Sequence, residues 1–157
     1  RVMELIARRQ PVASDLRTIL AAGSASLHLE RIADGIVDVA TVAGRGQLMR
    51  TGGVRHDLAR MADTVATMTE SAVEALIERQ ATATGQLIEQ ARALEELHQE
   101  IFADLADVHA NGTDRAAAIH TDLASRSIKR AGEHALDIYE QAIFATTGQR
   151  VELGRAG

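Results

Sequence analysis

The stretch Leu5-Ile6-Ala7-Arg8-Arg9-Gln10-Pro11-Val12-Ala13-Ser14-Asp15-Leu16-Arg17 contains the only proline in this chain of 157 residues. Proline fixes φ and has no backbone N–H, so it suits the first turn of a helix and is costly in a helix interior. The stretch therefore predicts that a helix over residues 1–8 ends before Pro11. A second, longer helix is predicted from Pro11 to about Ala43, ending at Gly44-Arg45-Gly46.

The composition favours a helical protein. Apolar residues make up 46% of the chain but aromatic residues only 2%, so alanine, leucine, isoleucine, valine and methionine must form the core. Small residues allow helices to approach closely and suit sheets poorly. We therefore predict an all-α fold. The net charge of −5 argues against nonspecific nucleic-acid binding, which requires a basic surface.

Two further absences from the sequence limit the function. The chain has no cysteine, so it offers neither a disulfide framework nor a thiolate metal site, and a reducing cytoplasm is the expected compartment. No apolar run approaches the roughly 20 residues of a membrane span. Because Arg1 already lies within the first helical pattern, we expect the sequence to lack the start of a longer protein.

Three apolar stripes predict an antiparallel three-helix bundle over residues 53–148. Apolar or small residues recur every three or four positions over 54–75, 87–108 and 128–145, as in helices with one buried face. Thr51-Gly52-Gly53 is the predicted linker before the bundle, and Asn111-Gly112-Thr113-Asp114 breaks it, with Thr113 or Asp114 capping the last helix. The expected division is a remnant of a first three-helix unit (1–50), a complete second bundle (51–150) and a tail (151–157).

A weak internal repeat supports this division. An offset of 99 residues gives five identities over positions 14–40, including Asp15 with Asp114 and Asp38 with Asp137. Asp34 then falls on Glu133. The repeat indicates a duplicated unit whose last helix carries acidic residues at the same depth.

Glu30, Asp34 and Asp38 are spaced four residues apart, so they share one face of the second predicted helix. Like charges at this spacing repel one another by a few tenths of a kcal/mol per pair. They form either a solvated face or the oxygen ligands of a hard cation or iron.

Three segments of the chain resemble the PhoU family of bacterial phosphate-uptake regulators. They are the proline stretch, Leu29-Glu30-Arg31-Ile32-Ala33-Asp34, and the segment from Arg130-Ala131-Gly132-Glu133-His134 to Thr147-Gly148. The resemblance implies tandem three-helix bundles, of which this chain holds one complete bundle, the third helix of a preceding one and a remnant. It implies a regulator without enzymatic activity that restrains phosphate uptake and phosphate-starvation signalling. Its implied partners are a phosphate ABC transporter, a sensor histidine kinase and a second copy of the chain in a homodimer.

The resemblance also implies where metal would bind. PhoU-like proteins carry Glu/Asp-x-x-x-Asp motifs, some of which hold metal clusters, and Glu30-x-x-x-Asp34 matches one of them. The corresponding positions of the second bundle read Ala91-x-x-x-Glu95 and Lys129-x-x-x-Glu133, so each has lost a carboxylate. The candidate ligands of iron, manganese, magnesium or zinc are Glu30, Asp34, Asp38, Glu95, Glu133 and Asp137. Our hypothesis is that the Lys129 ammonium replaces metal charge by pairing with Glu95 or Glu133.

Other patterns leave alternatives open. Glu95-Glu96-Leu97-His98 contains the Glu-x-x-His spacing of di-iron proteins, but a di-iron site needs two such motifs and the chain offers one. We therefore interpret His98 as a hydrogen-bonded core residue. Gly35 and Gly132 mark either close contact between helices or tolerated weak points. A carboxylate-bridged metal protein and a generic helical signalling scaffold are the alternative functions.

Overall fold

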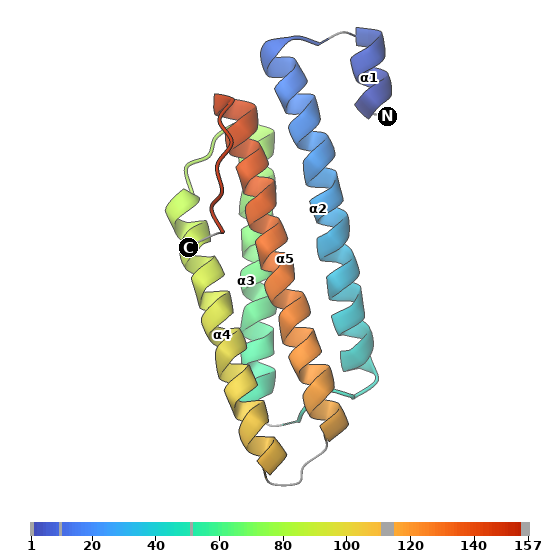
Figure 1. Ribbon diagram of the computed structural model, residues 1–157, viewed down its shortest axis with the longest axis vertical. Helices are drawn as coiled ribbons and strands as arrows, with labels where there is room; N and C mark the ends of the chain where they lie inside the picture. Colours follow the sequence, from blue (N-terminus) through green and yellow to red (C-terminus); the bar gives the residue numbers. More distant parts are fainter. Residues whose placement is uncertain (1, 10, 51, 111–114, 155–157) are drawn as a thin grey trace.

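The structure describes residues 2–9, 11–50, 52–110 and 115–154, and this part of the chain contains five helices and no strand. The computed structural model places α1 at Val2–Arg9, α2 at Ala13–Gly44, α3 at Gly52–Glu78, α4 at Thr84–Ala110 and α5 at Arg115–Thr147 (Figure 1). The predicted all-α fold is confirmed.

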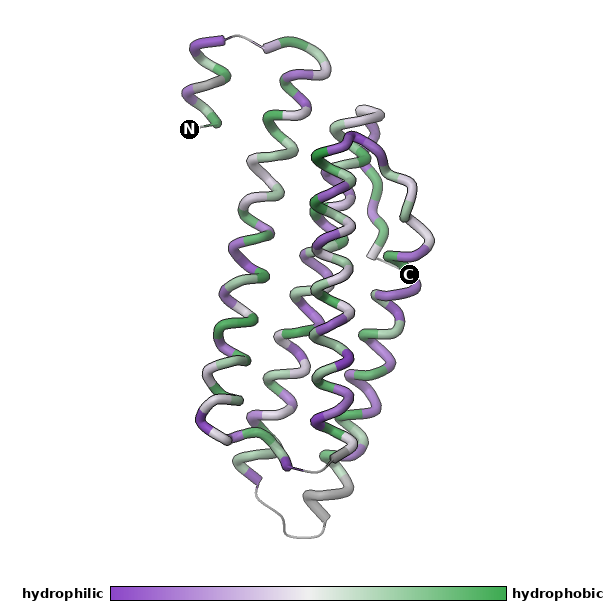
Figure 2. Tube along the Cα trace, turned by 180° about the vertical axis from the view of Figure 1, so that it is seen from behind, coloured by the Kyte–Doolittle hydropathy of each residue, from purple (hydrophilic) through white to green (hydrophobic). Residues whose placement is uncertain are grey.

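Helix α5 is the central helix of the molecule. It packs against α2, α3 and α4, while α3 also packs against α4 and α1 packs on α2. Figures 1 and 2, which view the molecule from opposite sides, show α2 and α5 running side by side over most of their length. The predicted bundle of α3, α4 and α5 is therefore joined along one side by α2, the helix predicted from the proline stretch.

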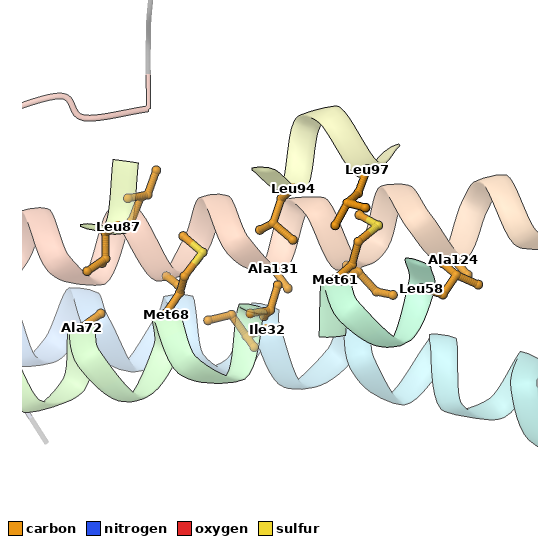
Figure 3. Close-up of a cluster of buried hydrophobic side chains, with 14 of the residues drawn as sticks. Ile32, Leu58, Met61, Met68, Ala72, Leu87, Leu94, Leu97, Ala124 and Ala131 are labelled. Carbon is orange, nitrogen blue, oxygen red and sulfur yellow. The ribbon is translucent and has the colours of Figure 1, made fainter. Parts of the chain in front are cut away.

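The core consists of medium-sized side chains packed against small ones. Met61 and Met68 of α3 and Leu94 of α4 are almost fully buried, and they lie close to alanines of α5 such as Ala131 (Figure 3). Small residues on α5 let three helices approach it closely, which a central helix of large side chains would not allow. From α2, Ile32 reaches the same cluster.

Two predicted helix starts differ from the structure. Helix α2 begins at Ala13 rather than Pro11, with Val12 in extended conformation as its N-cap. Helix α3 begins at Gly52, so part of the predicted glycine linker is helical. Residues 45–50 connect α2 to α3 instead, and the buried Met49 backbone N–H there donates to Thr121 Oγ1 of α5 at 2.8 Å. This bond and the burial of the Met49 side chain hold the connection against the bundle and leave the glycines free to start α3.

The predicted end of α5 near Gly148 is confirmed. Gly148 has φ +78°, and its N–H donates to the Phe144 carbonyl at 2.9 Å. Glycine adopts this left-handed conformation without steric cost, which makes it the usual residue after a helix end. The predicted caps Thr113 and Asp114 lie outside the described residues.

The two glycines singled out in the sequence differ in their surroundings. A Cβ atom at Gly132 would lie 2.3 Å from Leu94 Cδ1, whereas one at Gly35 would meet only the Ser127 carbonyl oxygen at 3.7 Å. Gly132 therefore permits a close α4–α5 contact, and Gly35 is a tolerated weak point of α2. No helix in the described parts of the chain is long and apolar enough to cross a membrane.

Candidate functional site

A cluster of charged side chains joins α4 to α5 at the second bundle's acidic-motif positions. Lys129 Nζ lies 2.9 Å from Glu95 Oε2 and 3.5 Å from Glu133 Oε1. The hydrogen bond from Lys129 lowers the pKa of the Glu95 carboxyl, and the same bond raises the pKa of the Lys129 ammonium. The Lys129 ammonium thus pairs with both carboxylates, and its replacement of a metal charge stays a prediction.

A groove runs beside this cluster between α4, α5 and residues 152–154. Its volume is about 740 Å³, and the charged side chains lining it are two basic and five acidic: Arg92, Lys129, Glu95, Glu133, Asp137, Glu140 and Glu152. The tail forms one wall because the Leu153 backbone N–H donates to Glu140 Oε1 at 2.7 Å. With a formal charge of −3, the groove attracts cations and repels free anions.

The three acidic residues of α2 do not meet. Glu30, Asp34 and Asp38 are all exposed, and none forms a hydrogen bond or ion pair with another residue that the structure describes. Their carboxylates therefore form a solvated face of α2, one of the two outcomes that their spacing allowed.

Where α2 meets α5, three side chains converge that the sequence analysis did not bring together. His28 Nδ1 of α2 lies 3.2 Å from Asp137 Oδ2 of α5, and His134 Nδ1 lies 3.1 Å from the same oxygen. The two Nδ1 atoms are 3.3 Å apart. We call His28, His134 and Asp137 the seam cluster. It is the one group of three metal-ligating side chains within mutual reach among the residues described.

His98 has a structural partner. Its Nδ1 lies 2.9 Å from Ser125 Oγ, and the Ser125 hydroxyl also donates to the Asp122 carbonyl at 2.9 Å. The predicted hydrogen bond of His98 is confirmed, the side chain is partly buried, and the bond links the antiparallel helices α4 and α5.

Comparison with known proteins identifies the family. The sequence model of the PhoU domain matches residues 1–43 and 58–142. The chain belongs to the PhoU family. It is 26% identical to a phosphate-specific transport system accessory protein PhoU homolog of Clostridium acetobutylicum, over 98% of this chain and 71% of that protein. It is 30% identical to PhoU homolog 2 of Mycobacterium tuberculosis, over 92% of this chain and 68% of that protein.

Within this PhoU-family chain, the six acidic candidates now have defined surroundings. Glu95 and Glu133 share Lys129, while the three residues of α2 point into solvent. Of the six, Asp137 alone lies within ligand distance of two further donors. Metal binding at the family's motif positions stays a prediction.

No spacing along a single helix reveals the seam cluster, because His28 lies on α2 and His134 on α5. The position of each histidine relative to the buried residues of its own helix could have indicated the cluster. His28 lies three residues after Ala25 and four before Ile32, both buried. His134 stands in the same relation to the buried Ala131 and Ile138 on α5. Each histidine therefore lies on the apolar stripe of its helix, which places both where helices meet.

Proposed function

We propose that this protein restrains phosphate uptake and phosphate-starvation signalling by docking to a phosphate ABC transporter and its sensor histidine kinase. The observation that carries the proposal is the match of the PhoU domain to most of the chain. Its relatives are named as accessory proteins of the phosphate-specific transport system, which supports the proposal. We place the protein in the cytoplasm, where such a transporter and kinase expose their intracellular parts.

The proposed mechanism is noncatalytic. Rigid helices would bind a partner and shift its conformational equilibrium through differential affinity for its states. The sequence supports this because it contains no cysteine nucleophile and no glycine-rich phosphate loop. The structure also exposes large apolar side chains that a partner could cover.

One such surface lies near the α4–α5 connection. Phe102 of α4 and Ile119 and Leu123 of α5 are large apolar residues that are about half exposed. Because the His98–Ser125 hydrogen bond pairs the antiparallel helices α4 and α5, Phe102 lies at the same depth along the bundle as the helical turn from Ile119 to Leu123. We name these three residues the distal patch and propose that it binds a component of the transport system with which the relatives' names associate them.

A deletion strain grown with ample phosphate tests the function. We expect derepressed alkaline phosphatase or excessive phosphate uptake, reversed by the intact gene. Wild-type behaviour in a strain that also lacks every paralogue would contradict the proposal and favour a generic scaffold.

Two matched variants test the distal patch. Phe102→Asp should fail to restore repression, whereas Ile77→Asp, which changes an exposed apolar residue of α3, should restore it. Equal complementation by both variants would exclude the patch while leaving the regulatory function standing. A homodimer is also part of the proposal, and sedimentation of the full protein as a monomer at micromolar concentration would contradict it.

A further inference from the structure

The seam cluster has the spacing of a metal site. At a metal–ligand distance of about 2.1 Å, donor atoms lie about 3.0 Å apart in an octahedral site and about 3.4 Å apart in a tetrahedral one. The three distances among His28 Nδ1, His134 Nδ1 and Asp137 Oδ2 are 3.1, 3.2 and 3.3 Å. A cation could therefore bind all three donors with little movement of the helices.

The orientation and burial of the cluster agree with this. The two imidazole rings are tilted by 49° with their centroids 5.4 Å apart, so their Nδ1 atoms converge on the carboxylate instead of stacking. The two histidine side chains are only about a quarter exposed, and Asp137 is 41% exposed. The cluster is thus partly desolvated but reachable from the solvent.

Charge around the cluster favours a cation. His134 and Asp137 also line the groove between α4, α5 and the tail, whose charged side chains sum to −3. The Lys129 ammonium in that groove is already paired with Glu95 and Glu133. A divalent cation at the cluster would face a net negative surface and one coordinating carboxylate.

The geometry points to a divalent transition-metal site formed by His28, His134 and Asp137 across the α2–α5 seam. Two imidazoles and one carboxylate suit Zn²⁺ or Fe²⁺ better than Mg²⁺ or Ca²⁺, which prefer oxygen ligands. Three protein ligands leave at least one coordination position open toward the groove. His28 precedes His134 by 106 residues in the sequence, so the metal would link α2 to the bundle formed by α3, α4 and α5.

This site shares Asp137 with the acidic candidates but takes its other two donors from histidines outside the acidic motifs, and it goes beyond the proposed function. Its donors are nitrogen-rich, whereas Glu30, Asp34 and Asp38 offer only oxygen and do not converge. Its test is made on purified protein, so its failure would leave the regulatory proposal unaffected.

Titration of the full, metal-stripped protein with Zn²⁺ alone tests the site. We expect one tightly bound ion per chain by calorimetry and a higher thermal midpoint with Zn²⁺ present. His28→Ala and Asp137→Asn should each weaken binding by more than the roughly 10–100-fold that loss of an outer-shell partner costs. His56→Ala, which removes an exposed histidine of α3, should bind as the unaltered protein does.

Co²⁺ gives a second, spectroscopic test. Its visible absorption bands should report nitrogen ligation in the unaltered protein and change in His28→Ala, whose helix content is checked by circular dichroism. Absence of Zn²⁺ binding would overturn the assignment. So would binding that His28→Ala leaves unchanged, or binding that is lost instead in a Glu30→Gln/Asp34→Asn variant.

Discussion

The close contact at Gly132 makes a quantitative prediction. Replacing glycine by alanine within a helix gains about 1 kcal/mol in helix propensity. At Gly35 nothing opposes this gain, because the new Cβ would meet one backbone oxygen at an ordinary distance of 3.7 Å. Gly35→Ala should therefore stabilise the protein by about 1 kcal/mol.

At Gly132 the same substitution meets a fully packed neighbour. The new Cβ would lie 2.3 Å from Leu94 Cδ1 and 3.6 Å from Val65 Cγ2, and both of these side chains are buried. Inserting a methyl group into a packed core costs about 1–3 kcal/mol. After the gain in propensity, Gly132→Ala should be destabilising by roughly 0–2 kcal/mol, so the two variants should differ by about 1–3 kcal/mol.

Urea denaturation followed by helical circular dichroism measures this difference. A double-mutant cycle identifies its cause: in a Leu94→Ala background, Gly132→Ala should become stabilising because the clashing atom is gone. If Gly132→Ala and Gly35→Ala stabilise the protein equally, the close α4–α5 contact is refuted.

Two further predictions concern polar contacts. Lys129→Met should lower stability by at most about 1 kcal/mol, because the ion pair with Glu95 is partly exposed. Since the pKa of Glu95 is lowered in the fold, its contribution is present above its ordinary value of 4.5 and is lost as pH falls. Since the pKa of Lys129 is raised, its contribution to stability is present below its ordinary value of 10.5 and is lost as pH rises further. The free energies of unfolding of the variant and the unaltered protein should therefore converge at low and at high pH. A constant difference at all pH values would contradict this. Thr121→Val should cost about 1–3 kcal/mol by leaving the buried Met49 N–H unpaired. Hydrogen exchange at that amide should accelerate, and unchanged protection would contradict the assignment.

Much of the fold could be predicted because apolar periodicity is local. The stripes over 54–75, 87–108 and 128–145 lie within α3, α4 and α5, since a helix must bury one face. The helix starts were less accurate. Pro11 precedes α2 instead of opening it, and Gly52 is helical because residues 45–50 supply the turn.

The candidate site was predicted less completely. Lys129 was predicted to meet Glu95 or Glu133 and contacts both, because the resemblance placed them at matching depths on adjacent helices. The seam cluster was missed because it depends on the pairing of α2 with α5. Periodicity shows that each histidine faces a neighbour but not which neighbour.

The central position of α5 has a consequence for how the chain folds as it is made. Helix α2 packs on a helix that is translated about 100 residues later. At about 5–20 residues per second, α2 stays without this partner for roughly 5–20 s during synthesis. Helices α3 and α4 can pair earlier, but each of them also packs against α5. Completion of the tertiary structure therefore waits for the last helix, and apolar faces of α2 are exposed to chaperones and proteases until then.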